Sequence, residues 1–276
     1  MKKIHLFLSF IILLILSSCS FEYKLAKEFQ QNPPDFYLKV KPPAHLFKYN
    51  HKGEMIEDFE KLTGSQQDSA LDASSFFTRH IDDSVFLEKY VNGFIDELRK
   101  LDFSVYLGNQ ADSFLLQQTQ SYLIDMIQLQ IDEYFYPFED KEYYYDTLYY
   151  KSVNLNAVDF STWIELGKLK ASRKQKTVLY SSHMATDDFA GSFLLDPFRQ
   201  DVKYSYTIDS LSVPDIYEIA GFLGKVHASY LYDFFLNQYI AFHLPQGFRP
   251  EVYYHYNRFR KSFVVVDEER FELLES

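Results

Sequence analysis

The longest amphipathic pattern in the sequence runs from Ser212 to Pro245, and it constrains the fold more than any other feature. Ser212 and Asp215 have the spacing of a helix-capping box, and Pro214 stands in the first turn, where proline is tolerated. Apolar residues then recur at helical spacing until Pro245. The pattern predicts a helix over residues 213–243, about 45 Å long. A helix of this length needs a broad apolar surface to cover it.

Small residues form a stripe along this predicted helix. Ala220, Gly224 and Ala228 follow one another at intervals of four residues. In a membrane such a stripe would indicate close pairing of two helices, but Lys225 and Asp233 argue against a membrane span. We therefore expect the stripe to let the helix lie close to a sheet.

A shorter amphipathic pattern predicts a second helix over residues 84–100, preceded by N-cap side chains from Asp82 onward. Alternation of apolar and polar residues predicts strands. These strands are expected at 103–107, 127–131, 153–157 with a continuation to 166, 177–180, 204–208, 252–256 and 262–266. The polar stretch 62–75 predicts a loop. Together these elements predict an α+β fold with a mainly antiparallel sheet.

Charge and composition limit the kinds of molecule that the protein can bind. The net charge is -11, so the protein repels nucleic-acid phosphates, and we expect no nucleic-acid partner. A basic segment near the C-terminal end is the exception, and we interpret it as a solvated strand or loop face; its basic residues are Arg249, Arg258, Arg260 and Lys261. The 23 tyrosines and 27 phenylalanines suit either a β-rich core or half-buried interfaces.

The first residues have the pattern of an export signal. Two lysines precede an apolar run from Ile4 to Leu16, which as a helix spans about 20 Å and is too short for the roughly 30 Å hydrocarbon layer. The length predicts a signal peptide over residues 1–18. Cys19 follows it and is the only cysteine, which excludes intramolecular disulfides and thiolate metal clusters.

The sequence Leu16-Ser17-Ser18-Cys19 resembles the lipobox of bacterial lipoprotein precursors. The resemblance implies a diacylglycerol on the Cys19 thiol, cleavage between Ser18 and Cys19, and acylation of the new amine by a fatty acid such as palmitate. By the sorting pattern of this family, Ser20 in place of aspartate implies the outer membrane, and the lack of an acidic run after Cys19 implies its periplasmic face. The alternative is an ordinary signal peptide with an incidental cysteine.

Two proline pairs divide the mature chain. Pro33-Pro34 and Pro42-Pro43 favour extended backbone, so residues 19–44 are expected to form a lipidated tether. Residues 35–40 fit a first strand equally well. Residues 45–276 are then expected to form a single α+β globular domain.

Motifs for phosphate-binding loops, serine hydrolases and zinc proteases are absent from the sequence, and no cofactor is expected. The best polar cluster contains His183, Asp187 and Asp188, which can hold a divalent cation or orient a hydroxyl group. Polar residues in a turn after a strand explain the same cluster, and we favour that interpretation.

Tyrosines are densest between residues 134 and 150, where carboxylates accompany them. Tyr143, Tyr144, Tyr145 and Tyr149 are candidates for a ligand site or a protein interface, or they pack as the tip of a hairpin. The leading hypothesis is a non-enzymatic accessory or interaction lipoprotein of the cell envelope, whose layout is loosely similar to auxiliary lipoproteins of transport systems. A lipoprotein that binds sugar or peptide is the first alternative, and a hydrolase or metal-dependent enzyme is the second.

Overall fold

The computed structural model describes residues 21–117, 120–169, 176–196, 198–199, 201–267 and 270–274. The expected signal peptide and Cys19 lie outside the described residues. A helical segment covers residues 21–31. The further helices are η1 (Lys52–Met55), η2 (Phe59–Lys61), α2 (Gly64–Ser74), α3 (Asp83–Lys100), η3 (Gly108–Gln110), α4 (Ala111–Leu115) and α5 (Val213–His243). The strands are β1 (Tyr37–Lys41), β2 (Leu46–Asn50), β3 (Ser104–Leu107), β4 (Ser121–Tyr144), β5 (Thr147–Lys168), β6 (Lys176–Thr186), β7 (Asp188–Asp196), β8 (Asp201–Asp209), β9 (Tyr253–Asn257), β10 (Ser262–Val266) and β11 (Glu272–Leu274).

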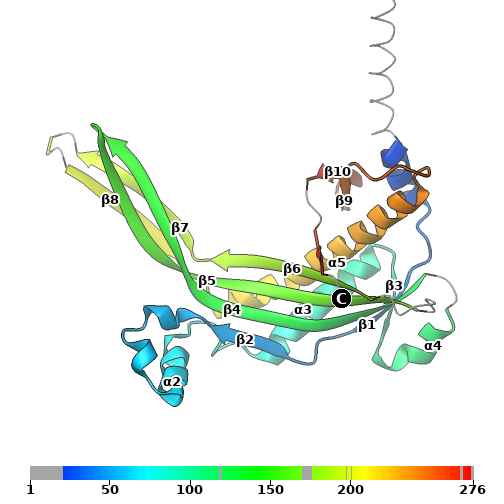
Figure 1. Cartoon of the computed structure of the whole chain (residues 1–276), viewed down its shortest axis with the longest axis horizontal. Coiled ribbons are helices and arrows are strands. Elements are labelled where there is room, and N and C mark those ends of the chain that lie inside the picture. Colours follow the sequence, from blue (N-terminus) through cyan, green and yellow to red (C-terminus); the bar gives the residue numbers. More distant parts are fainter. Residues whose placement is uncertain are drawn as a thin grey trace, which may run out of the picture.

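The predicted α+β fold and both predicted long helices are confirmed. The main sheet has the strand order β11-β6-β5-β4-β1-β3, and β2 pairs with β4 beyond the end of β1 (Figure 1). Pairing is antiparallel between β4, β5, β6 and β11, whereas β1 and β2 run parallel to β4. The strands predicted at 252–256 and 262–266 are present as β9 and β10, and they form a separate two-stranded sheet.

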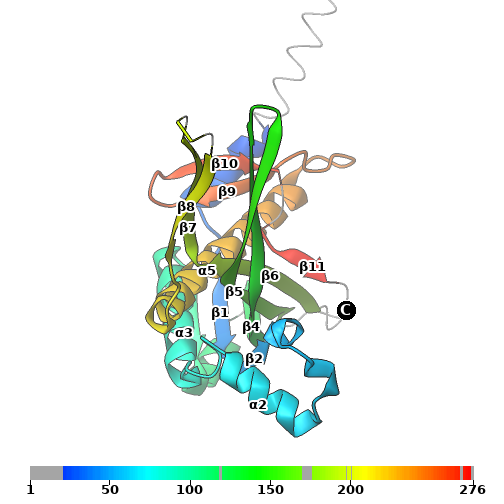
Figure 2. The ribbon, with the colours of Figure 1, turned by 90° about the vertical axis from the view of Figure 1, so that its left-hand side faces the viewer.

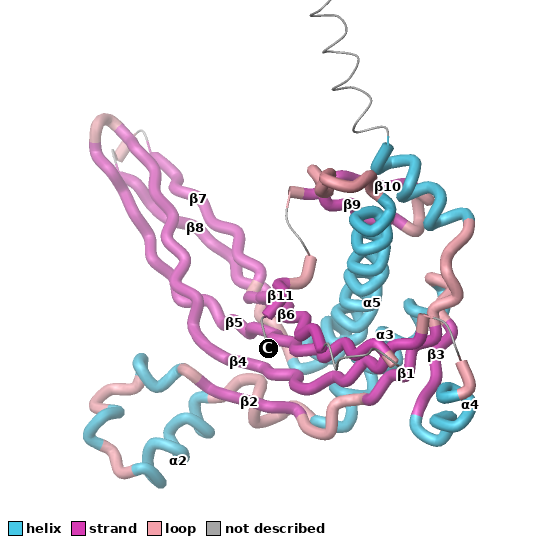
Figure 3. The backbone as a smooth tube through the Cα atoms, turned by 45° about the vertical axis from the view of Figure 1, so that its right-hand side comes forward, coloured by secondary structure: helices cyan, strands magenta, loops and turns pink. Residues whose placement is uncertain are grey.

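Strands β4 and β5 are 24 and 22 residues long, far longer than typical strands of globular proteins. Their distal halves leave the sheet and run beside the hairpin of β7 and β8, and together the two hairpins form an arm (Figures 1 and 3). Hydrogen bonds join the hairpins, from Tyr204 to Asp140 at 2.9 Å and from Tyr144 to the carbonyl of Phe193 at 3.0 Å. The hairpin of β4 and β5 turns at Tyr145 and Asp146, both of which have positive φ as in a type I′ turn.

Helices α3 and α5 cover one face of the main sheet (Figure 2). Phe86 of α3 stacks on Phe160 of β5, and His227 of α5 contacts His183 of β6. The predicted stripe of small residues does not face the sheet. A Cβ atom on Gly224 would lie 2.1 Å from the carbonyl oxygen of Tyr90, so the stripe brings α5 against α3. The prediction was wrong because the spacing of residues along a helix cannot show which neighbour the helix meets.

The expected tether over residues 19–44 is wrong for the part that is described. Phe29 in the helical segment 21–31 is 1% exposed, and Leu38 of β1 is fully buried. The prolines bracket the strand β1, which confirms the alternative interpretation of residues 35–40. The expected loop at 62–75 contains helix α2, which starts with a capping box of Thr63 and Gln66 and buries no residue. Because α2 has no apolar face to bury, its sequence shows no apolar residues at helical spacing, and the helix was not predicted.

In the part of the chain that the structure describes, no helix is long and apolar enough to cross a membrane.

Candidate functional site

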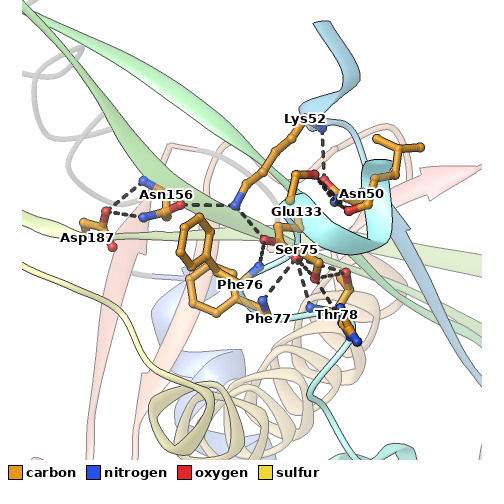
Figure 4. Close-up of polar contacts among 12 residues, drawn as sticks. Asn50, Lys52, Ser75, Phe76, Phe77, Thr78, Glu133, Asn156 and Asp187 are labelled. Carbon is orange, nitrogen blue, oxygen red and sulfur yellow. Dashed lines mark hydrogen bonds and ion pairs between the residues drawn. The ribbon is translucent and has the colours of Figure 1, made fainter. Parts of the chain in front are cut away.

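A buried ion pair joins strand β4 to the start of η1. The Nζ atom of Lys52 donates to Oε1 of Glu133 at 2.6 Å and to Oδ1 of Asn156 at 3.1 Å. Neither Lys52 nor Glu133 exposes any part of its side chain. The ammonium group also lies 4.3 Å from the ring centre of Phe76 (Figure 4) and 4.6 Å from that of Phe135, so two aromatic rings pack against it.

Glu133 collects hydrogen bonds from the segment that links α2 to α3. Its Oε2 accepts from the hydroxyl of Ser75 at 2.8 Å and from the amide of Thr78 at 2.9 Å, and its Oε1 accepts from the amide of Phe76 at 2.6 Å. Burial alone would raise the pKa of Glu133, but the hydrogen bonds from Lys52, Thr78 and Phe76 outweigh it and lower the pKa to about 2. Because both charges are enclosed, this cluster fixes the segment to the sheet.

Asp187, a member of the predicted polar cluster, extends the same network. Its Oδ2 accepts from the amide and the side chain of Asn156, at 2.8 and 2.9 Å, and its Oδ1 accepts from the amide of Leu211 at 2.9 Å. Asp187 is buried and stands between β6 and β7, where the chain passes from the sheet into the arm. Asp187 therefore fastens the base of the arm through Asn156 (Figure 4). Through Leu211 it also fastens the chain that leads into α5.

His183, Asp187 and Asp188 do not converge on one site. His183 faces α5, with its ring centre 5.2 Å from that of His227, and burial lowers the pKa of His183. Asp188 is exposed on β7. The turn interpretation was also incomplete, because residues 181–186 continue β6 and only Asp187 lies between strands. Among the described residues, no three histidine, cysteine or acidic side chains are placed to hold a metal ion.

The face of the sheet opposite α3 and α5 carries a polar groove of about 660 Å³. Pairing between neighbouring strands places polar side chains side by side in this groove. Asp132 of β4 lies opposite Asp159 of β5, and Ser161 of β5 lies opposite Ser182 of β6. Tyr180 also lines the groove and packs against Trp163, with ring centres 4.9 Å apart. Aromatic rings beside carboxylates and hydroxyls are typical of pockets for polar small molecules.

Two neighbouring carboxylates line this groove, and they differ in their hydrogen-bond and ion-pair partners. Asp132 accepts from Gln130 at 2.7 Å and contacts Nε2 of His51 at 2.8 Å. Asp159 has no ion-pair partner among the described residues, and its pKa is raised by burial and by the nearby charge of Asp132. Burial and the charge of Asp159 in turn raise the pKa of Tyr134 to about 12. A ligand that donates hydrogen bonds or carries positive charge would relieve the repulsion between the carboxylates.

The end of the arm exposes a cluster of aromatic side chains. Tyr143 is 70% exposed, Tyr145 78% and Tyr150 71%, and Phe198 beside the neighbouring hairpin is 97% exposed. Tyr144 and Tyr149 are half-buried, and the ring of Tyr149 lies 6.4 Å from that of Phe193. The four tyrosines predicted as a site therefore do not line one pocket. Two of them pack the hairpins together, and two face solvent.

No protein-family model and no curated protein matches this chain. A functional assignment therefore depends on the surfaces of the chain itself. Nothing in the sequence pointed to the Lys52–Glu133 pair, because its partners are far apart along the chain. One sequence pattern did indicate the groove, namely the polar side of the strand predicted at 127–131. The structure places Gln130 and Asp132 from this side on the face of the sheet opposite α3 and α5.

Proposed function

We propose that the protein is a lipid-anchored lipoprotein of the bacterial cell envelope that acts as a non-enzymatic accessory component and docks on a partner protein through its arm. The observation that carries the proposal is the exposed aromatic cluster at the end of the arm, formed by Tyr143, Tyr145, Tyr150 and Phe198. Tyrosine is enriched at protein interfaces because a rigid ring adds contact area at little entropic cost, and its hydroxyl binds polar partners. Exposed clusters of this kind mark interaction surfaces.

The arm is built to hold this cluster in place. The two hairpins are tied by the hydrogen bonds of Tyr204 and Tyr144, and Asp187 fixes the base of the arm. Carboxylates, including Glu142 and Asp146, accompany the aromatic rings at the tip. These negative charges are repelled by anionic lipids, so a partner protein with a basic surface is a better match for the tip than the lipid bilayer.

The position of the arm supports a membrane-associated partner. Figures 1 and 2 share their vertical axis, and in both the arm tip and the helical segment 21–31 lie at the upper end of the molecule. If Cys19, two residues before this segment, carries the lipid, the tip and the anchor reach the same side. We propose a transport or assembly machine of the outer membrane as the partner, met at the periplasmic face.

Site-specific photocrosslinking in cells tests this proposal. A benzoylphenylalanine at Tyr145 is expected to give one discrete protein adduct, and the same group at Leu116 is the control. Leu116 is 77% exposed and follows α4, far from the arm. Adducts of equal yield at both positions, or none at Tyr145, would contradict docking through the tip.

The groove on the open face supports a second candidate function, the binding of a sugar or peptide. The observation in its favour is the pair Asp132 and Asp159, which lines one groove together with Tyr180. Trp163 is the single tryptophan and contacts Tyr180, so its fluorescence reports on occupancy of the groove. Saturable changes on addition of oligosaccharides or lysine-containing peptides, lost in Asp159→Asn, would support this function. A flat titration with both ligand classes would count against it.

A further inference from the structure

The helical segment 21–31 is built into one end of the molecule. The carboxylate of Glu22 accepts from the amide of Glu251 at 3.0 Å, and the ring of Tyr23 lies 6.0 Å from that of Phe263 in β10. The segment also meets the last turns of α5, where Phe29 packs on Tyr239. This segment, the β9–β10 hairpin and the C-terminal end of α5 lie together in Figures 1 and 2, and we call this part of the molecule the anchor end.

Two turns at the anchor end expose phenylalanine beside basic side chains. The first follows α5 and contains Phe248, which is 67% exposed, and the exposed Arg249. The second joins β9 to β10 and contains Phe259, 87% exposed, with the exposed Arg260 and Lys261. Because the two turns lie at opposite ends of β9, they flank the place where Tyr23 contacts the hairpin.

The second turn is held in place rather than loose. Arg258 donates to the carboxylate of Glu97 in α3 at 2.7 Å, and its guanidinium lies 4.6 Å from the ring centre of Phe259. The neighbouring Arg260 and Lys261 form no ion pair with a described residue, so their charges face solvent.

The charge of these turns is opposite to that of the whole protein. Residues 245–261 contain four basic residues and one acidic residue, Glu251, in a chain with a net charge of -11. A local reversal of this kind, combined with exposed rings, is the pattern of a surface that contacts anionic lipid headgroups. Phenylalanine inserts at the boundary of the acyl chains, and arginine and lysine pair with lipid phosphates.

We propose that the anchor end docks on an anionic lipid surface, with Phe248 and Phe259 in the headgroup region and Arg249, Arg260 and Lys261 against lipid phosphates. This inference rests on the lipid anchor of the proposed function and adds an orientation to it. A chain held only by its lipid would rotate freely about Cys19. Contacts at two turns on either side of the anchor hold the body in one orientation and present the arm to a partner in the same membrane.

Quenching of tryptophan by brominated lipids tests the orientation on the full lipidated protein. The protein is reconstituted in vesicles of three parts phosphatidylethanolamine and one part phosphatidylglycerol with brominated acyl chains. In a Trp163→Phe background, Phe259→Trp places the only tryptophan at the second turn, and Leu116→Trp is the matched control. Fluorescence of the first variant is expected to fall at least twofold relative to unbrominated vesicles, while that of the control stays unchanged.

Charge reversal separates the role of the basic residues from that of the ring. In the Phe259→Trp variant, the further changes Arg249→Glu, Arg260→Glu and Lys261→Glu are expected to abolish most of the quenching, with circular dichroism unchanged. Unquenched tryptophan at 259 in protein that stays with the vesicles would overturn the docking face but leave the anchor standing. Protein that separates from the vesicles altogether would overturn the anchor and the docking face together.

Discussion

The ammonium group of Lys52 lies 2.6 Å from the carboxylate of Glu133, and both side chains are fully buried although 81 residues separate them in the sequence. The pair joins η1 to the middle of β4, just where that strand leaves the sheet for the arm. Every oxygen of Glu133 has a donor, and two aromatic rings pack against the ammonium. The base of the arm is thus fixed by a polar cluster inside an otherwise apolar region.

Removal of one partner from this ion pair is expected to destabilise the folded protein strongly. Lys52→Met leaves the carboxylate of Glu133 buried without its cation, which should lower the free energy of unfolding by about 3–5 kcal/mol. Urea denaturation measures the change. The double variant Lys52→Met with Glu133→Leu removes both charges and should be more stable than Lys52→Met alone. A loss below about 1 kcal/mol for the single variant would show that the pair contributes little to stability.

The close contact between α3 and α5 leaves no room for a side chain at position 224, so any substitution of Gly224 is expected to destabilise the protein. A Cβ atom there would lie 2.1 Å from the carbonyl oxygen of Tyr90, and backbone atoms cannot move aside cheaply. Gly224→Ala should therefore cost about 1–3 kcal/mol or more, although alanine ordinarily favours helix over glycine. Gly64→Ala in α2 is the control, because a Cβ atom at that position would have no atom within 4 Å, and it should be neutral or slightly stabilising. Equal thermal midpoints for the two variants would disprove the close helix contact.

His227 should make the protein less stable in mild acid. Burial, together with the nearby His183, lowers the pKa of His227 from 6.5 to about 3, so the folded state resists protonation that the unfolded chain accepts. The stability from the neutral ring is complete above pH 6.5 and is lost as the pH falls towards 3, at up to about 1.4 kcal/mol per pH unit. His227→Gln keeps an acceptor for Tyr90 but does not titrate. Urea denaturation at pH 7, 6 and 5 should show a shallower loss for His227→Gln than for the exposed control His243→Gln, and parallel curves would contradict the assignment.

The lipid anchor gives a prediction that depends only on the sequence. Cys19→Ser removes the thiol that the lipobox resemblance assigns to diacylglycerol, so the variant is expected to lose retention in the membrane fraction. Fractionation of cells with a carbonate wash measures retention. A Cys19→Ser protein that stays firmly in the membrane would rule out this cysteine as the anchor.

Local patterns explain why some elements were predicted and others were not. The helix at 213–243 has its capping box, its proline and its apolar period in one stretch of sequence, and α5 follows it closely. Helix α2 has no buried side chain, so no period marked it. Strand β7 was missed because it pairs only with β8 in the arm, where both faces are largely exposed and alternation is weak.

Sites depend on contacts between distant residues, and the sequence predicts those poorly. Tyr143 and Tyr149 belong to one dense run of tyrosines, but the hairpin sends the first to solvent and the second against Phe193. His183 and Asp188 are five residues apart, yet the break at Asp187 directs one to α5 and the other to solvent. Lys52 has the pattern of an ordinary surface residue in the sequence. Glu133 continues the apolar positions 129 and 131 of its strand, but only the folded chain shows that Lys52 is the partner that meets it there.

Substitution at the arm tip should separate binding from folding. Tyr143→Ser with Tyr145→Ser removes two rings that are 70% and 78% exposed, so the free energy of unfolding should change by no more than about 0.5 kcal/mol for each. Tyr144→Phe with Tyr149→Phe leaves the packing of the hairpins intact and is the matched control. Its stability should change by about 1 kcal/mol or less through the lost hydrogen bond of Tyr144.

Affinity purification from gently solubilised outer membranes, read by mass spectrometry, tests docking through the arm most directly. The tagged natural protein and the Tyr144→Phe, Tyr149→Phe control should both retain one partner in stoichiometric amount, and the Tyr143→Ser, Tyr145→Ser variant should lose it. Recovery of the natural protein alone in several mild detergents, or equal recovery of the partner with the serine variant, would contradict the proposal that the arm tip is the docking surface.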